Sequence, residues 1–420
     1  MNHLKFKKRS LIFGSLLTVA LVVTTSCNKD EDESVEDFQQ IDHEQNLIPK
    51  EYIVVFKDAT IKSKAVAQES ISILEKYGIT EAQISREYTT IFKGILISGV
   101  SQETINTLKK DPIVKSVVQN SKFELEATPI VGHSQKMIND SIAPNGQIIP
   151  WGASRVGYGD GTGKKIWILD TGIADNREEF NIDRINSRNF SPDLGPDAWQ
   201  ANGSNHGTQV ASIAAAKNNA TGILGIAAGA TVVSIRTVGG GQDLAGLAGA
   251  LDYVGGRIQP GEVWNMSAGP TASRQALLNS VFRDQVALFE NALRALSNIA
   301  PGFVAAGNTG VDLDATPYSE SHFSGPNDQL YIVGAIDNNN NVWNSSMYGR
   351  VIDYWSPGVN LPSLRADGTV SHDSGTSLAS PTVAAMYLIS NGNLIIDSET
   401  ATDRNGHIRP IPRVETITPL

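Results

Sequence analysis

The chain has a single cysteine, Cys27, among its 420 residues, which excludes an internal disulfide. It also lacks an excess of basic residues, because 34 Lys and Arg face 44 Asp and Glu and the net charge is −10. A nucleic-acid-binding surface needs Lys and Arg to neutralise phosphates, so this balance argues against nucleic acid as a partner. Internal repeats are absent too, which excludes repeat architectures. The length exceeds one ordinary domain but stays below three.

Long apolar runs are also scarce. The run at the N-terminus ends near Val23 and is too short to span a bilayer comfortably, while basic residues precede it. Residues 1–26 are therefore predicted to be a signal peptide, and the chain is expected to be exported. Cys27 follows directly after small residues and resembles the lipidated cysteine of bacterial lipoproteins, which implies a membrane anchor in the cell envelope. Residues 27–50 are acidic and predict a solvated tether, similar to the surface-export signals of some lipoproteins.

A small unit is predicted over residues 51–127. Strand-like runs such as "EYIVVF" and "IFKGILISGV" alternate with helical stretches such as "SKAVAQESISILEKYG". Their order is β, α, β, β, α, β, which predicts a small α+β sandwich of the ferredoxin-like type. A unit of this size is expected to be only marginally stable alone.

A larger unit is predicted over residues 147–395. Apolar strand runs, among them "KKIWIL", "ATVVSIRTV", "EVWNMS", "GFVAA" and "LYIVGAI", are separated by helical stretches such as "QDLAGLAGALDYV". Buried strands that alternate with helices predict an α/β fold with a mainly parallel sheet and helices on both faces. Functional side chains are then expected at the carboxyl ends of the strands.

Four polar residues stand at such positions. Asp170 and Asn308 each follow a strand run, and His206 and Ser377 stand at the heads of predicted helices, where the helix dipole should keep the imidazole neutral. Each has an ordinary explanation as a cap or turn residue. Together they suggest that Asp170 orients His206, that His206 deprotonates Ser377, and that the Asn308 amide stabilises an oxyanion.

Five motifs, "DTGI", "HGT", "NMS", "AAGN" and "GTSLASP", occur in the order typical of subtilisin-like serine proteases, which this chain resembles from about residue 147 to 390. The resemblance implies a serine endopeptidase with an Asp-His-Ser triad and an acyl-enzyme. Asn205 and Gln209 replace the family's usual Gly and His, which predicts altered supporting contacts. A catalytically silent peptide-binding relative of the same fold is the alternative, and a processing protease with one dedicated substrate would use the same chemistry.

The resemblance also implies where substrate peptides bind. An extended peptide is expected between two backbone segments, although the glycines could instead form only a flexible loop. The residues are Gly239, Gly240, Gly241, Ser267, Ala268 and Gly269. Because "NMSAGP" replaces the commoner "NMSLGG", Ala268 lies in a wall of the pocket for the side chain before the cut bond, and specificity stays open.

Residues 51–127 resemble the inhibitory propeptide of the same family, especially in "YIVVFKD" and "KKDPIVKSVV". This implies a monomeric, self-inhibited zymogen whose own propeptide covers the cleft. Residues 128–146 are then the processing linker, which is cut at one of its ends. Residues 396–420 form a tail without helical periodicity, where the family normally adds helices.

A structural calcium site is implied by the resemblance of "KNNATGI" to the family's calcium loop. The oxygen donors of such a site suit Ca²⁺, and the alternative is an Asn-rich turn without an ion. The ligand set would comprise Gln147, Glu179, Lys217, Asn219, Thr221 and Ile223.

Overall fold

The computed structural model describes residues 46–57, 66–123, 125–128, 130–133, 140–176, 178–191, 197–198, 204–270, 272–318 and 329–415. The predicted signal peptide, Cys27 and most of the predicted tether lie outside these residues. The chain divides into Met1–Ile41 and Asp42–Leu420, and all described elements belong to the second unit. No described helix is both long and apolar enough to cross a membrane.

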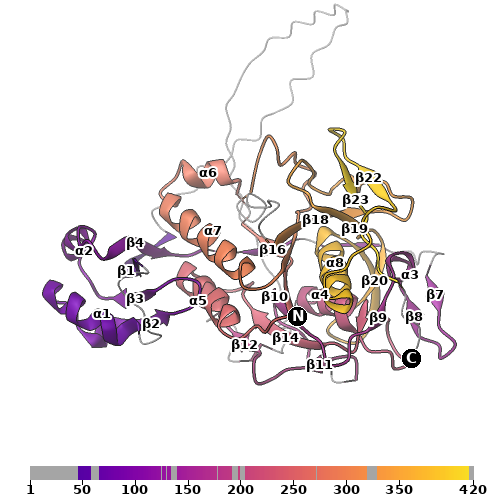
Figure 1. Cartoon of the computed structure of the whole chain (residues 1–420), viewed down its shortest axis with the longest axis horizontal. Coiled ribbons are helices and arrows are strands. Elements are labelled where there is room, and N and C mark those ends of the chain that lie inside the picture. The colour runs from indigo at the N-terminus through magenta and orange to yellow at the C-terminus, as the bar shows by residue number, and fades with distance from the viewer. Residues whose placement is uncertain are drawn as a thin grey trace, which may run out of the picture. The chain divides into compact units, whose positions relative to one another are not determined.

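The N-terminal part of this unit is a four-stranded antiparallel sheet with two helices, in the predicted order β, α, β, β, α, β (Figure 1). The strand order in the sheet is β2-β3-β1-β4. Its elements are β1 (Leu47–Phe56), α1 (Val66–Leu74), the 3₁₀ turns η2 (Glu75–Tyr77) and η3 (Glu81–Gln83), β2 (Ile84–Tyr88), β3 (Gly94–Ser98), α2 (Gln102–Leu108) and β4 (Val114–Ser121).

The larger part is built on an eight-stranded sheet in which every pairing is parallel, so the prediction of a mainly parallel α/β fold is confirmed. The order is β11-β14-β10-β15-β17-β18-β19, and β12 also pairs with β14. The strands are β10 (Lys165–Asp170), β11 (Asn181–Ile182), β12 (Arg188–Asn189), β14 (Thr231–Arg236), β15 (Val263–Met266), β17 (Gly302–Ala305), β18 (Leu330–Ile336) and β19 (Tyr354–Pro357).

Helices cover both faces of this sheet because its strands are apolar on both sides. In β10, Ile166 and Ile168 pack in one buried cluster with α4 and α8, whereas Trp167 and Leu169 pack in another with α5 and α7. The helices are α3 (Trp151–Val156), α4 (His206–Ala215), α5 (Leu244–Gly255), α6 (Arg274–Leu278), α7 (Arg283–Ser297) and α8 (Thr376–Ser390).

The N-terminal sheet is buried on both faces too. Val54 of β1 packs with α1 and α2, while its neighbours Ile53 and Val55 belong to the cluster of α5 and α7. At the end of α5, the Asp252 carboxylate accepts hydrogen bonds from the backbone N–H groups of the turn after β2, with Thr90 N at 2.7 Å and Ile91 N at 3.0 Å. Covering the second face of the small sheet therefore requires the larger part.

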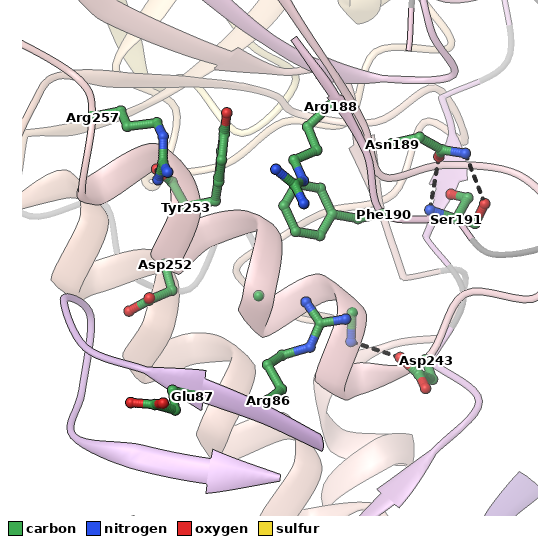
Figure 2. A pocket seen from close by; sticks show the side chains of 12 residues that line it. Arg86, Glu87, Arg188, Asn189, Phe190, Ser191, Asp243, Asp252, Tyr253 and Arg257 are labelled. Carbon is green, nitrogen blue, oxygen red and sulfur yellow. Dashed lines mark hydrogen bonds between the residues drawn. The ribbon is translucent and has the colours of Figure 1, made fainter. Parts of the chain in front are cut away.

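A cavity of about 790 Å³ opens beside this contact (Figure 2). Arg86 of β2, Arg188 of β12 and Arg257 after α5 line it, and the guanidiniums of Arg188 and Arg257 lie 5.5 and 3.7 Å from the ring centre of Tyr253. Three acidic side chains, Glu87, Asp243 and Asp252, balance these cations. The lining residues come from β2, β12 and α5 with their adjoining turns and include none of the four predicted catalytic residues.

Short strands complete the unit and bring distant segments together. They are β5 (Glu126–Ala127) with β16 (Ala268–Gly269), β6 (Val131–His133) with β20 (Leu361–Leu364) and β21 (Val370–Ser374), β7 (Ser141–Ile142) with β8 (Ile148–Ile149), β9 (Gly159–Asp160) with β13 (Ala227–Ala228), and β22 (Thr400–Thr402) with β23 (Ile408–Pro410).

The C-terminal tail is folded as far as it is described. After α8 the chain forms the β22–β23 hairpin, in which Ala401 is buried, and Ile411 just after it is buried too. The Val414 N–H donates to the Val156 carbonyl at 2.8 Å, and Glu399 pairs with both Arg155 and Arg413. The tail thus packs against α3 and the last strand of the sheet without forming a helix.

Candidate active site

Asp170 is the last residue of β10, at the carboxyl edge of the large sheet. It is 1% exposed, and its Oδ1 lies 2.8 Å from His206 Nδ1 and accepts a hydrogen bond from Thr171 N at 2.7 Å. The Thr237 N–H donates to its carbonyl. The carboxylate is therefore held against the imidazole by the end of the strand and the turn that follows.

His206 begins α4, where the chain approaches the Asp170 turn closely. A Cβ on the next residue, Gly207, would lie 2.3 Å from the Gly172 carbonyl oxygen, so only glycine fits there. The Gly207 N–H donates to Thr171 Oγ1 at 3.0 Å. These contacts place the imidazole, which is 7% exposed, directly over Asp170.

The pKa of His206 is raised from its ordinary value. Burial favours the neutral ring, but the Asp170 carboxylate outweighs it through its charge and its hydrogen bond, and the Thr128 carbonyl contributes a further hydrogen bond. The full charge of Asp170 at 2.8 Å acts more strongly on this ring than the partial charge of the helix end.

Ser377 is the second residue of α8 and is fully buried. Its Oγ donates a hydrogen bond to the Thr128 carbonyl oxygen at 3.0 Å, and His206 Nε2 lies 3.0 Å from the same oxygen. Two side chains far apart in sequence thus converge on one peptide carbonyl, and Asp170 contacts the other nitrogen of the imidazole. His206 Nδ1 faces Asp170 and Nε2 faces the Thr128 oxygen, so each ring nitrogen has an oxygen partner.

Asn308 lies beside the start of the same helix. Its Oδ1 accepts hydrogen bonds from Thr376 N at 2.9 Å and Thr376 Oγ1 at 2.8 Å, which fixes the orientation of the amide. Just before it, Gly307 has a φ of +108°, and a Cβ there would lie 2.6 Å from the Met347 sulfur. The donor end of the amide, Nδ2, is opposite to this anchored oxygen.

The chain's own segment before Thr128 lies where a substrate peptide is predicted. Strand β5 pairs antiparallel with β16, with Ala127 opposite Ala268 and Glu126 opposite Gly269, and Thr128 N donates to the Ser267 carbonyl at 3.1 Å. This is the backbone pairing expected of an extended peptide on Ser267–Gly269.

The second predicted segment, Gly239–Gly241, has a positive φ at each glycine. The backbone of the segment before Thr128 contacts the residues just after these glycines: Phe123 N donates to the Gln242 carbonyl at 3.2 Å, and Lys122 forms a bridge with Asp243.

A pocket of about 180 Å³ adjoins Thr128. Its lining residues are Glu126, Ala127, Thr128, Gly269, Pro270, Gly307, Asn308, Thr309, Tyr318 and Met347.

The two substituted positions near His206 have new partners. Gln209 Nε2 donates to Asp373 Oδ2 at 2.7 Å and to Ser363 Oγ at 3.1 Å, and Asn205 Oδ1 accepts from Ala366 N at 3.0 Å. The substitutions therefore tie α4 to the β20–β21 hairpin. Sequence reasoning identified neither these partners nor Thr128 as the residue at the centre of the site.

The predicted calcium ligands converge on one point. Gln147 Nε2 lies 2.7 Å from the carbonyl oxygens of Lys217 and Thr221, 3.0 Å from that of Ile223 and 3.4 Å from Asn219 Oδ1. The amide nitrogen carries only two hydrogens, so it cannot donate to all four of these oxygens. Rotating the side-chain amide by half a turn would exchange Nε2 for Oε1 and place a fifth oxygen beside the other four.

Glu179 belongs to the same cluster. Its Oε1 accepts from Thr221 Oγ1 at 2.7 Å, while its buried Oε2 has no hydrogen-bond partner among the described residues. Among those residues no group of three or more His, Cys, Asp or Glu could hold a metal, but this set consists mainly of neutral oxygens. Its chemistry fits a hard cation such as Ca²⁺.

Comparisons with known proteins identify the families that this chain resembles. Residues 161–393, more than half of the chain, match the profile of the "Subtilase family", and residues 51–126 match "Peptidase inhibitor I9". The chain is similar to "M-protease" of Shouchella clausii, with 27% identity over 80% of each chain. It is also similar to "Subtilisin Savinase" of Lederbergia lenta, with 30% identity over 57% of this chain and 82% of that one.

Among solved structures, the fold resembles the epidermin leader peptide processing serine protease of Staphylococcus aureus. The TM-score is 0.56 at 17% identity, covering 81% of this chain and 88% of the other. The profile that spans more than half of the chain decides the family. The chain belongs to the subtilase family of serine endopeptidases and carries a peptidase inhibitor I9 domain ahead of its protease domain.

Proposed function

We propose that Asp170, His206 and Ser377 are the catalytic triad of this endopeptidase and that Asn308 completes its oxyanion hole. The observation that carries this assignment is the shared carbonyl of Thr128, which lies 3.0 Å from both Ser377 Oγ and His206 Nε2. Nucleophile and base therefore face the same peptide group, while Asp170 holds the other ring nitrogen.

In the proposed reaction, Ser377 Oγ attacks the carbonyl carbon of a substrate while His206 Nε2 takes its proton. The negative charge that forms on the carbonyl oxygen receives a hydrogen bond from Asn308 Nδ2. His206 then gives its proton to the leaving amine, and the carbonyl stays bound to Ser377 as an ester. Water, deprotonated by His206, attacks this ester and releases the acid and the free serine.

The same geometry supports self-inhibition, with domains assigned as residues 51–127 for the propeptide, 128–146 for the linker and 147–395 for the protease. Thr128 presents its carbonyl to the nucleophile, so a substrate cannot bind until this segment leaves. Cleavage within the linker is then the activating step.

A fluorophosphonate probe tests the proposed function. We expect the probe to label wild-type protein at Ser377 once the propeptide has left, and N-terminal sequencing to find a new terminus between Ala127 and Gln147. A wild type that has lost its propeptide yet stays unlabelled would favour the silent peptide-binding relative. Cleavage profiles on a peptide library separate a broad endopeptidase from a processing enzyme with one substrate.

Replacing Asn308 with alanine is expected to lower kcat by about 10² to 10³-fold, because one preorganised donor to the oxyanion is lost. KM should change little, since this hydrogen bond forms mainly in the transition state. Steady-state kinetics on a peptide substrate measure both constants. Asn339→Ala, in an exposed turn, serves as the control. An unchanged kcat in Asn308→Ala would remove this residue from the proposed site.

We further propose that Gln147, Glu179, Lys217, Asn219, Thr221 and Ile223 hold a structural calcium ion. With Ca²⁺ at about 100 times its Kd, binding stabilises the folded state by about 2.7 kcal/mol. In Ser377→Ala protein, which avoids autolysis, EDTA is therefore expected to lower Tm by about 3 to 5 °C. Glu179→Gln should shrink this difference. Equal Tm values with Ca²⁺ and with EDTA would contradict the proposal.

Export and anchoring are proposed from residues outside the described part of the chain. We expect a monomer held to the bacterial envelope by a lipid on Cys27, beyond the cleaved signal peptide. Cell fractionation should recover the wild type with membranes and Cys27→Ser in the soluble fraction. A Cys27→Ser protein that stays in the membrane pellet would contradict a lipid on this residue.

A further inference from the structure

Beyond Thr128, the chain continues along a second edge of the site. Strand β6 pairs antiparallel with β21, with Val131 opposite Ser374 and Gly132 opposite Asp373. Strand β21 ends at Ser374, directly before the helix that carries Ser377. The linker is therefore bound on both sides of the Thr128 carbonyl, by β16 before it and by β21 after it.

Asp373 is a buried carboxylate on this second edge. It is 2% exposed, and its Oδ2 accepts hydrogen bonds from Gln209 Nε2 at 2.7 Å, Ser363 Oγ at 2.9 Å and Ser371 Oγ. Three donors on one oxygen fix the orientation of the group. Its other oxygen, Oδ1, lies 3.5 Å from the position that a Cβ on Gly132 would occupy.

A side chain at the position of Gly132 would thus start beside a negative charge. Partners in an antiparallel pair project from the same face, where opposite charges attract and like charges repel. The low exposure of Asp373 strengthens both effects, because little water screens them. Gly132 has no positive φ, and its Cβ position meets only ordinary contacts, so other residues fit there.

We propose that Asp373 is a specificity-determining residue that favours substrates with a basic side chain at the fourth residue after the cut bond and disfavours acidic ones. The numbering rests on the proposed function, because it takes Thr128 as the residue before the cut bond and Gly132 as the fourth after it. The occupant is an extended peptide paired with β21, as the linker is.

Peptides that differ only at this fourth position test the proposal. For activated wild type we expect kcat/KM to be about tenfold higher with Lys than with Asp, and Met to fall between them. Asp373→Asn should bring the three values close together. Asp367→Asn, which removes one exposed charge from the turn of the same hairpin, should keep the wild-type preference. Equal values in wild type, or a preference for Asp, would overturn the proposal.

Two further measurements separate the possible failures. A peptide that ends two residues after the cut bond should be cleaved equally by wild type and Asp373→Asn, which shows that the variant is folded.

If wild type cleaves no peptide, the proposed function fails, but the proposal on Asp373 is still tested in the uncut Ser377→Ala chain. There Gly132→Asp should lower amide hydrogen-exchange protection of β6 about tenfold and Gly132→Lys should not. Equal protection in both would count against Asp373.

Discussion

Replacing Ser377 with alanine is expected to lower kcat for peptide hydrolysis by about 10⁶-fold, the loss that follows removal of a triad serine in this chemistry. The variant keeps the cleft and its oxyanion donors but has no atom that can form the acyl-enzyme. Because Ser377 Oγ is buried and its partner among the described residues is the Thr128 carbonyl, the substitution disturbs little else in the described chain. Turnover of a fluorogenic peptide, with titration of active sites, measures the loss.

The control is Ser390→Ala at the other end of α8, whose hydroxyl donates to the Tyr387 carbonyl within the helix. It should keep wild-type turnover. Mass spectrometry of purified Ser377→Ala should find residues 51–146 still joined to the protease domain, since no nucleophile remains to cut the linker. An alanine variant that still hydrolyses peptides at the wild-type rate would refute the proposed triad.

The large sheet could be predicted because its strands are uninterrupted apolar runs. "KKIWIL" and "ATVVSIRTV" became β10 and β14, which pair in register from Lys165 opposite Thr231 to Asp170 opposite Arg236. Residues on both faces of such strands are buried, and that pattern indicates helices on either side. The polar residues that follow the runs then stand at one edge of the sheet, so the candidate site could be predicted as well.

The linker pairings could not be predicted in the same way. Strand β6 is only three residues long, and its partner β21 lies more than 200 positions away. A segment this short carries no hydrophobic pattern that would specify its register. For the same reason the sequence did not identify Asp373 or its contact with Gln209, which form only after α4 and the β20–β21 hairpin have packed together.

Replacing Asp170 with asparagine is expected to lower kcat by about 10⁴-fold while leaving the shape of the site intact. An asparagine can donate to Nδ1 from its amide, which favours the imidazole tautomer that carries its proton on Nε2. That nitrogen faces Ser377 across the site, so it could no longer accept the serine proton. Steady-state kinetics at the pH optimum of wild type measure this loss.

The pH profile distinguishes this role from a merely structural one. In wild type the pKa of His206 is raised, because Asp170 outweighs burial, and activity should fall as pH drops through this raised value. In Asp170→Asn the carboxylate is gone and burial dominates, so the pKa of His206 falls and the acid limb of kcat/KM moves to lower pH.

A control for this experiment is Asp337→Asn, since Asp337 also follows a strand of the large sheet. Its carboxylate accepts from the backbone N–H groups of Asn339 and Asn341, which is the role of a turn residue. This variant should keep both kcat and the acid limb of wild type. If Asp170→Asn did the same, Asp170 would be a turn residue too. The histidine would then need another group to hold its Nδ1 proton.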